Sequence, residues 1–206
     1  MNWTTGRITL PAPARLDCRP PRYDDVAIET LDPPAPVTST AAALVASARQ
    51  GDRQAFARLH EEFASTVHGL LLARAPREEA EDLVQEVFLK AWEALPSLRD
   101  PERFPGWLAT IARNAARDHR RRRMDAVPLP ADLSSEDAGT VEAEEVLAAI
   151  RELPEAYREP LVLRLVEGLS GPEIAARTGM TPGSVRVNLC RGMGKLRERL
   201  SEIGWP

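Results

Sequence analysis

The feature that most constrains the fold is a regular apolar repeat between residues 78 and 95. Apolar residues follow one another there at intervals of three, four and seven positions: Ala80, Leu83, Val84, Val87, Phe88, Ala91, Trp92 and Leu95. Because an α-helix has about 3.6 residues per turn, this spacing places all of them on one face of a helix. Such a stripe must be buried, so residues 78–95 are predicted to form one helix of a helical core.

Weaker forms of the same spacing predict seven further helices. They are expected at about 42–50, 52–73, 104–122, 142–152, 154–167, 170–178 and 181–202. No stretch alternates polar and apolar residues long enough to indicate a strand. The predicted fold class is therefore all-α, with two small modules: a helix bundle and a helix-turn-helix module.

Proline and acidic residues divide the chain into these modules. Residues 1–43 hold seven of the 18 prolines and are predicted to be a disordered extension. Residues 124–141 combine two prolines with Ser, Gly and acids and little apolar content, which predicts a flexible acidic linker. The modules are accordingly expected at 44–123 and 142–206.

Positive charge is concentrated, although the formal net charge is −4. Residues 113–123 contain six arginines and one aspartate at the end of a predicted helix. Arg113, Arg117 and Arg120 or Arg121 recur at helical spacing, so they predict a ridge that can follow nucleic-acid phosphates. The alternative is a solvated helix end whose arginines face the negative end of the helix dipole.

Residues 170–186 carry the capping residues of a helix-turn-helix motif. Ser170 and Thr181 are suited to cap two successive helices, and Gly179 is suited to the left-handed turn between them. The second helix would expose polar side chains that can contact base edges in the major groove: Ser184, Arg186, Asn188, Arg191 and Lys195. A helical hairpin that binds protein is the alternative interpretation.

The exposed side of helix 78–95 is mostly acidic. It comprises Glu81, Asp82, Gln85, Glu86, Lys90 and Glu93. This charge disfavours contact with DNA and suits a basic protein partner, while a plain solvated face is an equally open explanation.

The sequence lacks the residue patterns that are typical of metal sites, of common enzyme active sites and of membrane spans. Cys18 and Cys190 are far apart and support neither a disulfide framework nor a zinc site. No Ser/His/Asp arrangement or glycine-rich phosphate loop occurs, so we expect no metal, no cofactor and no enzymatic activity. The longest apolar run, residues 41–46, is too short to cross a bilayer, and no signal pattern is found. We expect a cytoplasmic protein without membrane insertion.

Four segments, taken in order, resemble a bacterial extracytoplasmic-function (ECF) sigma factor of the sigma-70 family. They are residues 50–56, 80–92, 104–118 and 153–161, the last followed by the helix-turn-helix motif. The resemblance covers about 44–203 and implies that 44–123 is sigma region 2 and 142–206 is sigma region 4. It implies a factor that binds core RNA polymerase, recognises promoter DNA at −35 and −10 elements, assists melting, and is often held by an anti-sigma factor.

The resemblance also implies roles for individual residues. Polymerase binding is expected at Asp82, Gln85, Glu86 and Lys90. Contact with the −10 element is expected at Leu98, Arg99, Trp107, Arg113, Asn114, Arg117, Arg120 and Arg121. Contact with the −35 element is expected at Thr181, Ser184, Arg186, Asn188, Arg191 and Lys195. Gly192 and Gly194 depart from the family pattern and predict that the C-terminal half of the last helix is frayed or stabilised by a partner.

Three alternatives are kept beside this interpretation. A helix-turn-helix regulator that acts without polymerase would bind a palindromic duplex alone. A protein-interaction module would show no steep salt dependence with DNA. A recombinase fragment would need a catalytic domain for which the chain has no room.

Overall fold

The computed structural model describes residues 37–125 and 138–204, and every regular element within them is helical. The α-helices are α1 (Val37–Ala48), α2 (Arg53–Leu72), α3 (Arg77–Ala94), α4 (Phe104–Asp125), α5 (Ala138–Glu152), α6 (Glu155–Leu165), α7 (Gly171–Thr178) and α8 (Pro182–Glu202). Two short 3₁₀ turns, η1 (Leu95–Ser97) and η2 (Pro101–Arg103), lie between α3 and α4. The predicted all-α fold is confirmed for the part of the chain that is described.

Side-chain caps fix where the helices begin. The Asp52 carboxylate accepts hydrogen bonds from the backbone N–H groups of Gln54 (2.8 Å) and Ala55 (3.1 Å) at the start of α2. Three helices extend beyond their expected ends, because α1 begins at Val37, α4 continues to Asp125 and α5 begins at Ala138. The arginines at the end of α4 favour helix and propagate it to Asp125.

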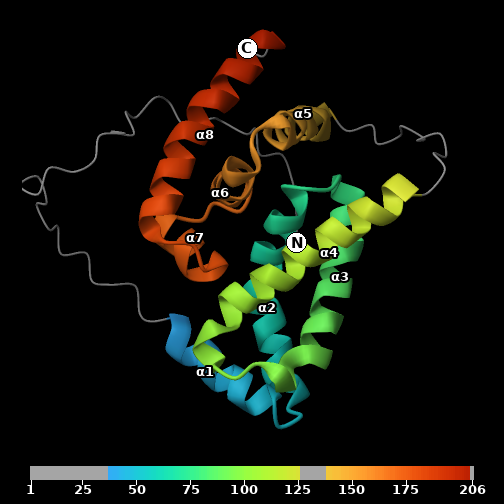
Figure 1. Ribbon diagram of the computed structural model, residues 1–206, viewed down its shortest axis with the longest axis vertical. Helices are drawn as coiled ribbons and strands as arrows, with labels where there is room; N and C mark the ends of the chain where they lie inside the picture. The colour runs from blue at the N-terminus through green and yellow to red at the C-terminus, as the bar shows by residue number, and fades with distance from the viewer. Residues whose placement is uncertain (1–36, 126–137, 205–206) are drawn as a thin grey trace, which may run out of the picture.

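The first module packs α1 to α4 around one core. Leu59 and Phe63 from α2, Val87 from α3, and Phe104 and Leu108 from α4 are all buried. The Phe63 and Phe104 rings meet edge to face with centroids 5.4 Å apart. This core holds α4 against α2 and α3, with α1 crossing one end (Figure 1).

The second module packs α5 to α8, and a glycine permits its tightest contact. A Cβ atom on Gly192 would lie 3.1 Å from Leu161 Cδ1 and 3.1 Å from Tyr157 Cβ, so α8 approaches α6 closely only because this side chain is absent. Helix α8 continues to Glu202 with Met193, Leu196 and Leu200 buried, so this half of the helix, which the sequence predicted to be frayed or stabilised by a partner, packs within its own module.

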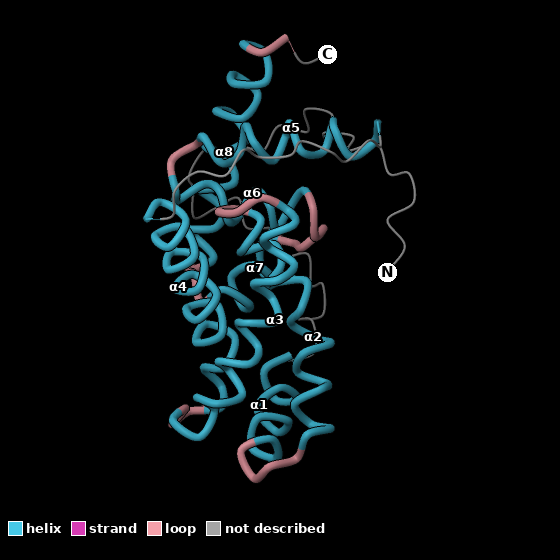
Figure 2. Tube along the Cα trace, turned by 90° about the vertical axis from the view of Figure 1, so that its right-hand side faces the viewer, coloured by secondary structure: helices cyan, strands magenta, loops and turns pink. Residues whose placement is uncertain are grey.

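The two modules lie directly against each other (Figures 1 and 2). Helix α2 contacts α6, and α4 contacts α7. A Cβ atom on Gly69 would lie 2.7 Å from Leu163 Cδ2, and one on Gly179 would lie 3.3 Å from the Gly106 Cα. The buried apolar residues therefore form a single cluster across both modules. Residues 126–137 of the predicted linker and 1–36 of the predicted extension lie outside the described residues.

Candidate nucleic-acid interface

The basic helix α4 presents only part of its predicted ridge to solvent. Asn114, Arg117, Arg120 and Arg121 are exposed. Their positions along α4 place them away from Leu108 and Ala112, which are buried in the first module. These four side chains are therefore available to an external polyanion.

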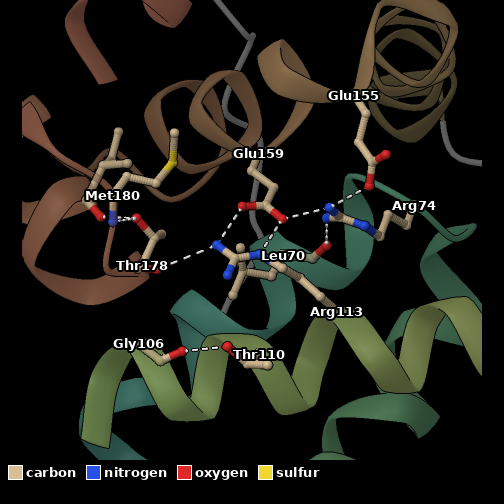
Figure 3. Close-up of polar contacts among 10 residues, drawn as sticks. Leu70, Arg74, Gly106, Thr110, Arg113, Glu155, Glu159, Thr178 and Met180 are labelled. Atoms are coloured by element: carbon tan, nitrogen blue, oxygen red, sulfur yellow. Dashed lines mark hydrogen bonds and ion pairs between the residues drawn. The ribbon is translucent and has the colours of Figure 1, made fainter. Parts of the chain in front are cut away.

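Arg113 is engaged within the protein instead. Its Nε donates to Glu159 Oε1 (2.8 Å) and its Nη2 to Glu159 Oε2 (2.9 Å), which is a bidentate pair across the two modules (Figure 3). The same Nη2 approaches the carbonyl oxygen of Thr178 at 3.4 Å. The Arg113 side chain is only 26% exposed, so it does not belong to the exposed basic surface of α4.

A second arginine of the first module converges on the same carboxylate. Nη2 of Arg74, in the turn after α2, lies 2.6 Å from Glu159 Oε1 and 3.1 Å from Glu155 Oε1. Burial alone would raise the pKa of Glu159, whose side chain is only 8% exposed, but the hydrogen bond from Arg113 and the charge of Arg74 outweigh it and lower the pKa. The hydrogen bond with Glu159 in turn raises the pKa of Arg113. Both charges of the pair are thus held in place.

The end of α4 contacts the acidic face of α3. His119 Nε2 lies 2.9 Å from Glu79 Oε2, and Arg123 pairs with the same carboxylate. Arg122 Nη2 lies 3.4 Å from Glu86 Oε2. The predicted basic and acidic surfaces therefore meet at one edge of the first module.

The expected polymerase-binding residues lie on the outer side of α3. Asp82 and Gln85 are exposed, while Glu86 and Lys90 are half-buried and pair with each other at 2.6 Å. The hydrogen bond from Lys90 lowers the pKa of Glu86. One turn after Gln85 the apolar side chain of Leu89 is 60% exposed, so this face offers both charge and an apolar contact.

The loop expected to contact the −10 element turns one of its predicted residues inward. Leu98 is only 6% exposed and belongs to the core, because η1 directs its side chain into the first module. Arg99 is exposed, and Trp107 is half-buried beside Phe104, with ring centroids 5.8 Å apart. Among these three, only Arg99 is exposed.

The helix-turn-helix motif has the predicted geometry. Ser170 and Glu173 form a capping box at the start of α7, Gly179 ends that helix with φ of 73°, and Thr181 Oγ1 accepts from the Ser184 backbone N–H (3.2 Å) at the start of α8. These local contacts confirm the motif and set α8 as its second helix.

Helix α8 gathers most of the expected −35 residues on one side. Ser184, Asn188, Arg191 and Lys195 follow one another at four, three and four positions, which places them in one row along the helix. Thr181 caps the start of the same row. Arg186 comes two residues after Ser184 and so lies on roughly the opposite side of the helix axis. The row, without Arg186, is the continuous polar face.

Several contacts between the modules had no counterpart in the sequence interpretation. Arg177 Nη1 donates to Thr66 Oγ1 (3.0 Å), and the Arg177 guanidinium lies 5.9 Å from the centre of the Phe63 ring. His68 Nδ1 lies 3.2 Å from Glu167 Oε1. These pairs are about a hundred residues apart in the chain, so no local spacing could have indicated them.

Metal binding and membrane insertion find no support in the described part of the chain. No group of three or more His, Cys, Asp or Glu residues within it could hold a metal ion. Cys190 is disulfide-bonded, which sequence spacing did not predict because such pairing depends on proximity in space; Cys18 lies outside the described residues. A search of the described helices finds none with the length and apolar character that a membrane span requires.

Comparison with known proteins matches both modules to one family. Residues 59–125 match the model of sigma-70 region 2, and residues 143–196 match that of sigma-70 region 4. Among curated relatives, RNA polymerase sigma factor CarQ of Myxococcus xanthus is 39% identical over 75% of this chain and 94% of its own length. The ECF RNA polymerase sigma-E factor of Haemophilus influenzae is 31% identical over 78% of this chain and 95% of its own.

A solved structure has the same arrangement of helices. CnrH, in complex with the cytosolic domain of CnrY, superposes with a TM-score of 0.59 at 28% identity, covering 79% of this chain and 98% of that one. The fold and the helix-turn-helix define a two-module, all-helical protein of the kind that this structure represents. The chain belongs to the ECF sigma factors of the sigma-70 family.

Proposed function

We propose that this sigma factor binds core RNA polymerase, recognises −35 and −10 promoter elements and assists promoter melting. The observation that carries the proposal is that one chain presents two separate polar and basic faces, one on α8 and one on α4, beside a mostly acidic face on α3. Two modules with one DNA-binding face each suit a promoter with two elements. Transcription of a promoter library by purified core polymerase, with and without the protein, tests it; equal promoter use in both reactions would reject the function.

The residue assignments follow the three faces. We assign the −35 element to the α8 row formed by Thr181, Ser184, Asn188, Arg191 and Lys195, with Arg186 contacting DNA from the flank. We assign the −10 element to the exposed residues Arg99, Asn114, Arg117, Arg120 and Arg121, and polymerase binding to Asp82, Gln85, Glu86 and Lys90. Buried Leu98 and half-buried Trp107 then shape the −10 site rather than stack on a base.

The proposed partners follow from the same interpretation. The relative CnrH is seen in complex with the cytosolic domain of CnrY. We extend this to the present chain as binding by an anti-sigma factor. The polymerase would catalyse RNA synthesis, so we propose that the chain itself is not an enzyme and needs no cofactor. We also propose that it acts in the cytoplasm. The proposed limits remain 44–123 for region 2, 124–141 for the linker and 142–206 for region 4, although α1, α4 and α5 each cross one of them.

Replacing Asn114 with alanine should impair open-complex formation more than binding to core polymerase. Its exposed amide is suited to hold an unpaired base by edge hydrogen bonds, which return part of the few kcal/mol that extruding a base costs. Permanganate footprinting of the melted region and a core-binding assay measure the two steps. The matched control is Thr110→Ala, exposed one turn earlier on α4. Equal loss in both assays would contradict the role of Asn114.

Replacing Arg191 with alanine should weaken recruitment through the −35 element by about 1–3 kcal/mol, because a guanidinium that contacts a guanine edge is lost. Competition binding of the polymerase holoenzyme to promoters with intact and altered −35 elements measures this difference. Arg197→Ala removes the same charge from another exposed position of α8 and serves as the control. If both variants lose affinity equally on the two promoters, Arg191 contributes only general charge.

A further inference from the structure

The carboxylate of Glu159 occupies a site made by two arginines of the other module. Three nitrogen–oxygen contacts hold it: Arg113 Nε at 2.8 Å, Arg113 Nη2 at 2.9 Å and Arg74 Nη2 at 2.6 Å (Figure 3). Arg74 comes from the turn after α2 and Arg113 from the middle of α4, so region 2 alone supplies all the donors. Region 4 supplies the anion, on α6.

The arginines depend on region 4 for their negative partners. Arg74 also contacts Glu155 Oε1 and the carbonyl oxygen of Leu70, and Arg113 also contacts the carbonyl oxygen of Thr178. Both carboxylates in this set, Glu155 and Glu159, belong to α6 and would leave if the modules separated. Region 2 would then expose two adjacent guanidinium groups without a carboxylate partner, and their combined donors and positive charge would favour binding of another anion.

The geometry of the site fits a phosphate as well as a carboxylate. An arginine fork donates two parallel hydrogen bonds to either group, and a second guanidinium adds charge on the same oxygen. Arg113 is adjacent in sequence to Asn114 and one turn from Arg117, both exposed and both assigned to the −10 strand. A strand held by these residues would bring its backbone close to the site.

We propose that Arg74 and Arg113 form a phosphate-binding site of region 2, filled by Glu159 while the modules are packed together and by a backbone phosphate of the −10 strand once they separate. The inference rests on the proposed function, because it needs a nucleic-acid strand on α4. It adds Arg74, which no spacing in the sequence indicated, to the DNA-binding residues. It also means that Glu159 of region 4 and the DNA backbone compete for the same arginine site on region 2.

The test measures binding of the full chain to a fluorescein-labelled single-stranded DNA of mixed sequence. Glu159→Gln keeps the shape of the side chain and removes its charge, so the form in which the modules are separated and the arginines are free to bind DNA should become more populated. The affinity for this DNA should then rise on the order of tenfold. Adding Arg74→Ala to that variant should reverse most of the gain. It should also reduce the slope of log affinity against log salt by about 0.7, the value for one phosphate contact on a single strand.

Two further variants keep the test independent of the behaviour of one substitution. Gly69→Leu wedges the modules apart at Leu163 and leaves the three charged residues in place, so it should raise the affinity as Glu159→Gln does. Arg58→Ala removes an exposed arginine of α2. In the Glu159→Gln background it should change the affinity for the DNA by less than about twofold, which is within experimental error. Unchanged affinity in Glu159→Gln and Gly69→Leu, or an equal effect of Arg58 and Arg74, would overturn the inference. Promoter-dependent transcription by the wild-type protein in the same preparation would show that only the inference, and not the proposed function, had failed.

Discussion

Replacing Glu159 with alanine should cost the packed arrangement of the two modules about 3 kcal/mol. Removing one partner of a buried ion pair leaves the other charge uncompensated, which costs about 3–5 kcal/mol, and the lower end applies because Arg74 and Arg113 keep some contact with solvent. Here two cations would be left facing one another. The modules should therefore separate while each keeps its own core.

Small-angle scattering and urea unfolding measure this outcome. The radius of gyration of the Glu159→Ala variant should exceed that of the wild type. We expect the wild type to unfold in one transition, because one apolar cluster spans both modules, and the variant in two. An unchanged radius with one transition would show that apolar contacts such as Gly69 against Leu163 hold the modules without the carboxylate.

A triple substitution is the matched control for charge. Arg74→Met, Glu159→Leu and Arg113→Met together replace the buried part of the ion network by apolar side chains of similar length and leave only the exposed Glu155. Such a replacement is often neutral or stabilising, since no charge is left buried. The two modules should therefore stay packed together in the triple variant, whereas they separate in the Glu159→Ala variant. Opening of both would mean that the shape of the network, rather than its charge, holds the interface.

Acid should weaken the same contact. The pKa of Glu159 is lower in the folded protein than in the unfolded chain, so its contribution to stability is complete above its ordinary pKa and is lost as the pH falls through the lowered value. The triple variant lacks this group and should lose less of its closed form over that range.

The sequence allowed the local structure to be predicted because local contacts determine it. The apolar stripe of α3, the Ser170 cap at the start of α7, and the glycine turn at Gly179 each involve residues within a few positions of one another. All were predicted from spacing and are present. The exposed row on α8 follows from the same periodicity.

The contacts between modules could not be predicted in this way. Glu159 looks like an ordinary surface acid among other charged residues, and its partners Arg74 and Arg113 lie far away in the chain. The basic run alone suggested that Arg113 faces solvent. Gly192 looked like a helix breaker because its contact with Leu161 is visible only in three dimensions. Packing decides such positions, and packing has no short-range sequence pattern.

The other large effect is expected at Phe104. Its ring is fully buried at the first residue of α4, where it meets Phe63 edge to face at 5.4 Å. Truncating a buried phenylalanine to alanine costs about 3–5 kcal/mol through lost burial and the cavity left behind. Phe104 also follows η2 directly, so its loss should release the loop that carries Arg99.

Thermal unfolding and transcription from a −10-dependent promoter measure the two consequences of Phe104→Ala. The unfolding free energy should fall by the stated amount, and transcription should decrease even at temperatures where the protein remains folded, since the loop would be less ordered. Leu89→Ala is the control for stability, because that side chain is 60% exposed and its removal should change the free energy by less than about 0.5 kcal/mol. Phe104→Ala could lower the stability and yet leave −10-dependent transcription unchanged. In that case η1 and the buried Leu98 are sufficient to hold Arg99 in place, and Phe104 does not position the loop.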